Sequence, residues 1–374
     1  MATNLSNYIK SNNHNKLDQA LNDDYKDFPC PPSNINQQKP SQKTIISKQQ
    51  KYDKFGNETI DFPTDYGTQR VTIEGDISSG KPIIMTYHDI GINHRACFTS
   101  FFTLIREYDP KFKYFTLVHI DAPQHHYDDI ENEHGPSTIY NDDKVESFDL
   151  LELASQIEEI RSKLGIERFL AFGVGAASNI FTHYAMNYSD RLRGMVLVNG
   201  LGSIASWREW IFDQLLWGIG SKSQFLVDSF QGSLLTRYFP KVQSQETYDY
   251  CLDQFDKIDA PSSIKYFRGF VRRTEFTEKQ LARITCKTLI ICGEYSRVKN
   301  ETIAFQKMMP RQYTTFVLMS ETGFLLTESC PQKLCSSIDL FVQSLGLTKI
   351  SLENKFGKLV EQNQLENGDG TVGL

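Results

Sequence analysis

The segment at 172–177 is the part of the sequence that best fits the site of a covalent reaction. Phe172-Gly-Val-Gly-Ala-Ala177 joins a predicted strand to a predicted helix. Enzymes that attack carbonyl groups place a serine, cysteine or aspartate on such a sharp turn. The middle position here is Gly175, which has no side chain and cannot attack a substrate. Ser178 follows three residues later, and we expect it inside the helix and away from the turn.

Two glycine-rich segments partly match phosphate-binding motifs. The first, Gly75-Asp-Ile-Ser-Ser-Gly80-Lys81, is followed by Pro82, which has no hydroxyl group for Mg²⁺ and leads into a strand, so we predict a hairpin turn. The second is the turn around Gly175. It lacks the third glycine of a dinucleotide site, and the next strand ends in Asn199 rather than an acidic residue. We therefore predict no nucleotide cofactor.

Histidine and aspartate are frequent between residues 119 and 134, where metal ligands would be sought. A metal site needs ligands at a rigid spacing with supporting partners. These residues fall at a strand end and in a polar loop, so we predict a solvated loop and no metal; they are His119, Asp121, His125, His126, Asp128, Asp129 and His134.

Strand and helix patterns alternate along most of the chain. Short apolar runs between amphipathic segments indicate parallel βαβ units and an α/β fold. We predict strands over 68–73, 82–88, 115–120, 168–172, 194–198, 288–292 and 315–319, and helices over 148–164, 176–188, 302–309 and 333–345. The first two strands are predicted to pair as an antiparallel hairpin.

The alternation is interrupted at 203–285, a segment of helical character that holds all three tryptophans. We predict that it forms a cap, inserted after the sixth strand, over the carboxyl ends of the strands. The core is then 61–202 and 286–348. Residues 1–60 are rich in Asn and Gln and are predicted to be a disordered tail, and 349–374 a flexible one.

Composition narrows the classes of function. The 374 residues carry 40 Lys and Arg against 46 Asp and Glu, a net charge of -6, which argues against nucleic-acid binding. No run approaches the ~20 apolar residues of a membrane span, and the start lacks the apolar segment of a secretory signal. Seven cysteines without framework spacing fit reduced thiols. The sequence predicts a cytoplasmic protein.

Four segments together resemble the NDRG (N-myc downstream-regulated) family. They are Lys81-Pro-Ile-Ile-Met-Thr-Tyr-His-Asp-Ile-Gly-Ile-Asn93, Val118-His-Ile-Asp-Ala-Pro123, Gly173-Val-Gly-Ala-Ala177 and Gly194-Met-Val-Leu-Val-Asn199. The resemblance implies an α/β-hydrolase fold, a mostly parallel central sheet flanked by helices. It also implies a protein without enzymatic activity, linked to differentiation, stress response, signalling and vesicle traffic. Ala177 stands where the family usually has glycine, and the carboxyl tail lacks the Ser/Arg-rich repeats of some vertebrate members.

Three catalytic positions of this fold are vacated in the sequence. The triad follows the order nucleophile, acid, histidine, and the matching places hold Gly175, Ser296 and Phe324. His183 is the last histidine of the chain, so no later residue can be the general base. We predict no catalysis. The alternative is a hydrolase with relocated groups, such as Ser178 acting with Glu294 or His88.

The loop that would form the oxyanion hole begins with His88, Asp89 and Ile90. If the amide groups of Ile90 and Ala176 still converge beside Gly175, a pocket under the cap could bind a small molecule or a lipid without converting it. In the other interpretation, His88 and Asp89 hydrogen-bond the loops at the top of the sheet.

The segment 206–217 has an apolar face through Trp207, Trp210, Ile211 and Leu215 and ends at Trp217. The three tryptophans are the candidates for a contact surface. Such a face docks a protein partner or a lipid surface, or packs on the sheet beneath it. The nearby cations Lys265, Arg268, Arg272 and Arg273 would favour anionic lipid, or simply form a solvated face. The function predicted is that of a binding or adaptor protein with unidentified protein partners and no cofactor.

Overall fold

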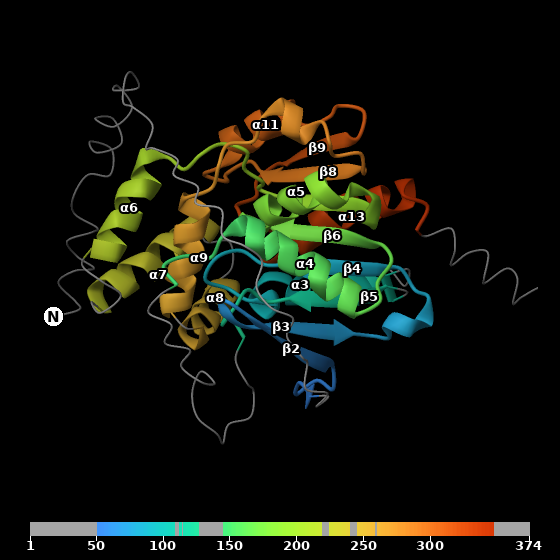
Figure 1. Cartoon of the computed structure of the whole chain (residues 1–374), viewed down its shortest axis with the longest axis horizontal. Coiled ribbons are helices and arrows are strands. Elements are labelled where there is room, and N and C mark those ends of the chain that lie inside the picture. Colours follow the sequence, from blue (N-terminus) through green and yellow to red (C-terminus); the bar gives the residue numbers. More distant parts are fainter. Residues whose placement is uncertain are drawn as a thin grey trace, which may run out of the picture. The chain divides into compact units, whose positions relative to one another are not determined.

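The computed structural model describes residues 51–108, 112–113, 115–126, 145–218, 224–239, 245–258 and 260–347 (Figure 1). Residues 1–50 of the tail predicted at 1–60 lie outside these residues, as do the whole predicted tail at 349–374 and Asp128, Asp129 and His134. Strands already begin at 51 and 58. The boundary predicted at residue 60 is therefore too late for the described part of the chain.

A sheet of nine strands forms the centre of the described residues, in the order β1-β2-β3-β5-β4-β6-β7-β8-β9. Strands β5, β4, β6, β7, β8 and β9 run parallel, whereas β1, β2 and β3 are antiparallel additions at one edge. The strands are β1 (Lys51–Tyr52), β2 (Glu58–Thr64), β3 (Gly67–Glu74), β4 (Ile83–Tyr87), β5 (Thr116–Ile120), β6 (Phe169–Val174), β7 (Leu192–Val198), β8 (Thr288–Gly293) and β9 (Thr314–Met319).

The hairpin predicted between the first two sequence-derived strands is wrong. Strand β3 pairs with β2 and β5, while β4 lies between β5 and β6. All five residues of β4 are buried, which suits a central parallel strand rather than the second arm of a hairpin. The segment after Gly75 is a short 3₁₀ turn at Ile77–Ser79, and the Asp76 side chain accepts a hydrogen bond from the Ser78 amide.

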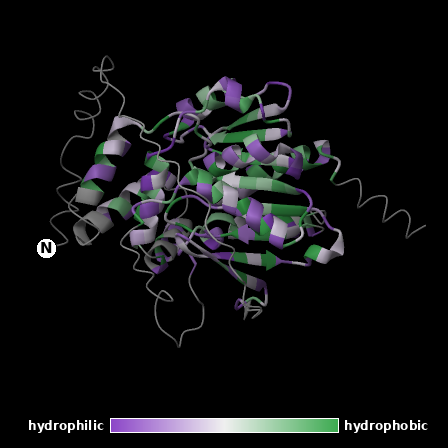
Figure 2. Cartoon of the chain, viewed as in Figure 1, coloured by the Kyte–Doolittle hydropathy of each residue, from purple (hydrophilic) through white to green (hydrophobic). Residues whose placement is uncertain are grey.

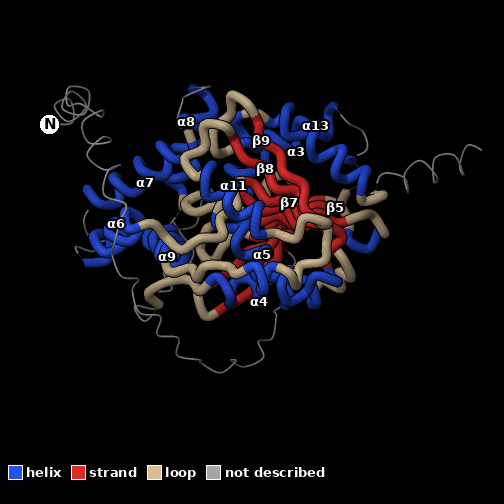
Figure 3. The backbone as a smooth tube through the Cα atoms, turned by 90° about the horizontal axis from the view of Figure 1, so that it is seen from above, coloured by secondary structure: helices blue, strands red, loops and turns tan. Residues whose placement is uncertain are grey.

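Helices cover both faces of the sheet. Seen from above, α3 (His94–Tyr108) and α13 (Pro331–Ser344) lie on one face, and α4 (Leu150–Lys163), α5 (Ala176–Tyr188) and α11 (Lys299–Met308) on the other (Figure 3). The short α12 (Leu326–Ser329) packs against α3. The strands are mostly apolar, and the outer helices alternate apolar and polar residues (Figure 2). The core therefore lies between the sheet and its two helical layers.

The cap predicted from the sequence is an insertion of helices beyond the carboxyl ends of the strands (Figure 1). It follows β7, the seventh strand of the described chain and not the sixth, because both β1 and β2 precede the first strand listed from the sequence. Its helices are α6 (Trp207–Gly218), α7 (Gln224–Tyr238), α8 (Gln245–Lys257), α9 (Ala260–Val271) and α10 (Glu278–Leu281).

The cap is attached to the core by hydrogen bonds to the loop after β4. The Tyr238 hydroxyl donates to the Ile90 carbonyl at 2.5 Å, and the Tyr266 hydroxyl donates to the His88 carbonyl at 3.2 Å. Among the described helices, none has the length and apolar content needed to cross a bilayer.

Candidate functional site

The turn between β6 and α5 keeps the shape of a nucleophile elbow without the nucleophile. Gly175 has φ +60° and ψ -118°, a conformation that strains any residue with a side chain. Its amide donates to the Val198 carbonyl at 2.8 Å, which ties the turn to the end of β7. A Cβ at Gly173 would meet the Phe181 ring at 2.8 Å. The close approach of helix α5 explains the glycine at 173, and the positive φ explains the glycine at 175.

The carboxyl group of Asp89 occupies the space in which a nucleophilic side chain would stand. A Cβ built on Gly175 would lie 2.2–2.4 Å from the carboxyl atoms of Asp89, far inside van der Waals contact. Asp89 Oδ1 also accepts a hydrogen bond from the Ala176 amide at 2.7 Å. That amide is the group predicted to help form an oxyanion hole, and it is already bound to an anion of the chain itself.

Residues from the cap and from the loop after β9 close the space around Asp89. Arg237 of α7 places Nη2 3.7 Å from Asp89 Oδ2, and its guanidinium lies 4.6 Å from the ring centre of Phe324. Phe324 is fully buried and packs against Tyr238, with ring centres 5.5 Å apart. The histidine position is thus filled by an aromatic ring that is held in place by a cation–π contact.

The acid position is also without an ionisable group. Ser296 is buried, its amide donates to the Gly293 carbonyl at 3.1 Å, and its hydroxyl accepts from the Val298 amide. Glu294, two residues earlier, accepts a hydrogen bond from the Glu321 amide at 2.9 Å. This carboxylate therefore fixes the loop after β9.

The relocated groups considered from the sequence are not brought together. The Ser178 hydroxyl lies inside α5 and is 3.1 Å from both the Gly173 and the Val198 carbonyls. His88 Nε2 accepts from the Ala122 amide at 2.8 Å, so its Nδ1–H donates to the Asp89 carbonyl at 2.7 Å. Both ring nitrogens of His88 therefore form hydrogen bonds to backbone groups of the loops. Burial lowers the pKa of His88 to about 3.

The five residues predicted to line a ligand pocket are all buried: His88, Asp89, Ile90, Gly175 and Ala176. The interpretation in which His88 and Asp89 hydrogen-bond the loops describes what their side chains do here. Sequence reasoning missed Arg237 and Tyr238 as partners of this site. In the sequence, only their place in the inserted segment could have pointed to these two residues. Their contacts with residues 89 and 90 span 148 positions of the chain.

The prediction of a solvated His/Asp loop is wrong for His119, Asp121 and His125, which are all buried. Asp121 accepts from the His94 amide and contacts His94 Nδ1, both at 2.8 Å. His119 contacts the Thr86 hydroxyl at 2.7 Å. The partners of Asp121 and His119 come from distant segments, which local composition does not reveal. In the part of the chain that the structure describes, no group of three or more His, Cys, Asp or Glu side chains is arranged to hold a metal ion.

Two carboxylates of this cluster, the buried Asp121 and the partly buried Glu74, are stabilised in their charged form. Burial alone would raise the pKa of Asp121, but His94 and His88 outweigh it and lower the pKa. For Glu74, the same cost of burial is outweighed by His119 and Arg106, and its pKa falls to about 2. The Arg106–Glu74 ion pair measures 2.7 Å. These hydrogen bonds and ion pairs therefore connect β3, β5 and α3.

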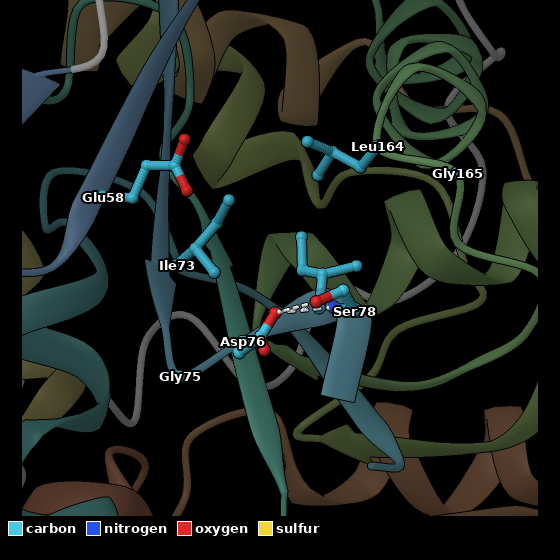
Figure 4. Close-up of a pocket in the computed structure, with 8 residues that line it drawn as sticks. Glu58, Ile73, Gly75, Asp76, Ser78, Leu164 and Gly165 are labelled. Atoms are coloured by element: carbon cyan, nitrogen blue, oxygen red, sulfur yellow. Dashed lines mark hydrogen bonds between the residues drawn. The ribbon is translucent and has the colours of Figure 1, made fainter. Parts of the chain in front are cut away.

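A surface pocket of 630 Å³ lies away from this site, beside the turn at residues 75–78 (Figure 4). Glu58 and Leu164 form opposite sides, and Asp76 turns toward Ser78, to which it is hydrogen-bonded. The partial phosphate-binding motif thus lines a pocket that contains two carboxylates, which would repel a phosphate group.

The apolar face of α6 points to solvent at Trp207 and Trp210, which are 54% and 47% exposed. The interpretation in which this face packs on the sheet is therefore wrong for these two residues. Ile211 and Leu215 of the same helix are also exposed. Trp217 belongs to α6, but its side chain lies outside the described residues.

Two of the nearby cations, Arg268 and Arg273, are buried and do not form a solvated face, whereas Arg272 is exposed. Arg273 is buried and pairs with Glu209 at 3.3 Å. Arg268 and Arg272 share Glu146, at 3.7 and 3.5 Å. Lys265, the fourth cation of the predicted cluster, is partly buried.

Comparison with known proteins decides the family. The model of the Ndr family matches residues 59–349, most of the chain. This chain belongs to the Ndr family. The resemblance found in the sequence is confirmed, and so is the α/β-hydrolase fold that it implied.

Relatives of the family share about a quarter of their residues with this chain. It is 26% identical to Protein NDL3 of Arabidopsis thaliana, over 76% of this chain and 80% of that protein. It is also 26% identical to the NDRG-like protein of Dictyostelium discoideum, over 72% and 80%. Protein NDRG3 of Xenopus laevis is 25% identical, over 79% and 78%.

Two solved structures of similar fold are described as enzymes. An enol-lactonase from Burkholderia xenovorans LB400 superimposes with a TM-score of 0.60 at 12% identity, covering 76% of this chain and 99% of that one. An esterase from Thermogutta terrifontis gives 0.58 at 13% identity, over 77% and 98%. At such identities the likeness concerns the fold alone.

Proposed function

We propose that this Ndr-family protein is catalytically inactive and acts in the cytoplasm as a binding or adaptor protein in signalling, stress response or differentiation. The observation that carries the proposal is the position of Asp89. Its carboxyl group stands within 2.4 Å of where a side chain on Gly175 would begin. It also accepts the hydrogen bond of the Ala176 amide.

The loss of chemistry follows from what the fold would need to supply. A nucleophile and its general base together account for several powers of ten in rate, and Gly175 and Phe324 supply neither. The remaining stabilisation comes from amide groups aimed at a developing oxyanion. The carboxylate of Asp89 occupies one such amide, and its negative charge would repel a second anionic oxygen.

A receptor that uses the inherited pocket is less well supported. Such a site needs a cavity large enough for a ligand, but the side chains around Gly175 bury one another. Arg237 lies 3.7 Å from Asp89 and contacts the ring of Phe324, which packs against Tyr238. Function is therefore assigned to the surface of the molecule.

The cap offers the surface for a protein partner. Ile204, Trp207, Trp210, Ile211 and Leu215 are all more than 40% exposed, and tryptophan is enriched at the centres of protein interfaces. The neighbouring arginines are paired with carboxylates. Among the described side chains, these arginines therefore leave little unpaired positive charge with which to attract anionic lipid, and a protein surface is the better match.

Two assays on the purified full chain test the loss of catalysis. A panel of acyl esters should be hydrolysed no faster than in buffer, and a serine-reactive fluorophosphonate should label no residue. Ester turnover that disappears in Ser178→Ala, or labelling of Ser178 found by mass spectrometry, would overturn the proposal.

The partner surface is tested by proximity labelling in cells. Trp207→Ser/Trp210→Ser should lose a defined set of neighbours that the wild-type chain retains. The matched control is Leu318→Ser/Leu340→Ser, which removes two exposed apolar side chains elsewhere and should keep those neighbours. Equal neighbour sets for both variants would contradict a role for α6.

A further inference from the structure

Three cationic side chains lie at the amino ends of the neighbouring strands β6, β7 and β8. Arg168 directly precedes β6, Arg193 is the second residue of β7, and Lys287 directly precedes β8. The three strands are neighbours in the sheet and run parallel. Their amino ends therefore meet at one edge, opposite the end that holds Gly175.

These cations line a groove of 500 Å³ that also includes Asp190 and Tyr313. Arg168, Arg193 and Lys287 are all exposed. Lys287 Nζ donates to the Ser344 carbonyl at 2.8 Å, and none of the three pairs with a carboxylate of the described residues. Asp190, the single acidic residue that lines the groove, faces Arg191 at 3.5 Å.

The charge of the groove is opposite to that of the whole protein. The chain has a net charge of -6, so polyanions are repelled by the molecule in general. A local excess of positive charge in a concave site selects for an anionic ligand. Guanidinium groups favour phosphate because their planar donors bind two oxygens at once.

We propose that this groove binds a compound that carries two or more phosphate groups. Neighbouring strands lie ~4.8 Å apart, so the starts of β6 and β8, two strands apart, are separated by about 10 Å. That span is wider than one phosphate group, so a single phosphate cannot contact Arg168 and Lys287 at once. A ligand with a second phosphate group can bind both. The volume of 500 Å³ falls within the range of small-molecule sites.

The phosphate groups could belong to a soluble metabolite or to a lipid headgroup, and the experiment separates these sources. Isothermal titration calorimetry of the full chain uses pyrophosphate and inositol hexakisphosphate as probes. Flotation uses phosphatidylcholine vesicles with and without phosphatidylinositol bisphosphate. Binding of a soluble probe only assigns a metabolite, and binding that requires the phosphoinositide vesicles assigns a headgroup.

The variant Arg168→Gln/Arg193→Gln should weaken binding of the responding probe by about tenfold or more. The matched control is Lys279→Gln/Arg297→Gln, which changes the net charge equally at two exposed cations outside the groove. It should bind within about twofold of wild type. Equal weakening by both variants, or no binding of any probe by the wild-type chain, would overturn the proposal.

A measurement on the unmutated chain guards against misfolding of the variant. Phenylglyoxal modifies exposed arginine side chains, and mass spectrometry reports each site. The responding probe should protect Arg168 and Arg193 but leave Arg297 reactive. Equal protection of Arg297, or no protection of Arg168 and Arg193, would contradict the groove as the binding site.

Discussion

The carboxylate of Asp89 lies against Gly175 and accepts a hydrogen bond from the Ala176 amide, while Arg237 approaches from the cap. Three features of a catalytic site, the place of the nucleophile, the anion-binding amide and the space under the cap, are thereby filled from within the chain. Sequence reasoning identified Gly175 and Phe324 as vacated positions. It did not identify what fills them, because contacts across 87 residues leave no local pattern.

At the scale of single residues, the buried histidine His183 should make the stability of the folded protein depend on pH. Burial lowers the pKa of His183 from 6.5 to about 4, so the unfolded chain binds a proton at a pH where the folded chain does not. Stability is then lost as pH falls below 6.5. We expect His183 to contribute roughly 3 kcal/mol of this loss by pH 4. Urea unfolding of His183→Gln should show a shallower pH dependence than wild type between pH 6.5 and 4; identical curves would contradict the assignment.

At the scale of elements, periodicity located the strands and helices but not their neighbours. Helix α5 begins at Ala176 and ends at Tyr188, as predicted. The β3–β4 hairpin was wrong because an apolar strand pattern shows that a strand is buried, not which strands flank it. The pattern at 206–217 likewise revealed a two-sided helix. The direction in which its apolar face points depends on the helices packed against it.

The exposure of α6 makes a testable contrast within the cap. Trp207→Ser and Trp210→Ser should each change the free energy of unfolding by less than about 0.5 kcal/mol, because both side chains are about half exposed. Phe230→Ala and Phe267→Ala should each cost roughly 3–5 kcal/mol, since these buried rings of α7 and α9 lie 5.4 Å apart. Urea titration measures all four, and a large loss at the tryptophans would contradict an exposed face.

The contact between α12 and α3 carries a second pH dependence of opposite sign. Glu328 is buried, and burial raises its pKa from 4.5 to about 8 in spite of a 3.2 Å hydrogen bond from the Ser100 amide. The folded chain holds this proton where the unfolded chain releases it, so stability is lost as pH rises from 4.5 through 8. Glu328→Gln should stabilise the protein relative to wild type at pH 8 and much less at pH 4.5. Thermal unfolding at both pH values decides this, and an equal effect would contradict it.

At the scale of the whole molecule, the two proposals concern opposite ends of one sheet. At the carboxyl ends, Asp89 lies against Gly175 beneath a cap that has an exposed apolar face. The amino ends hold a basic groove. The family and the fold were accessible from the sequence because four motifs occur in order between Lys81 and Asn199, inside the segment 59–349 that the family model matches. The contacts of Asp89 beside Gly175 could not be predicted from the sequence, because they join side chains that meet only in the folded chain.

A double-mutant cycle measures the central claim, that Asp89 fills the place of a side chain on Gly175. Gly175→Ala should cost roughly 3 kcal/mol in the wild-type background, where strain at positive φ and the clash with Asp89 add. In an Asp89→Ala background the same change should cost only the strain, about 1–2 kcal/mol. Gly80→Ala is the control, because Gly80 has φ +71° with open space around it. A coupling of about 1 kcal/mol or more between positions 89 and 175 is the expected result; additive effects would show that the carboxylate does not occupy that space.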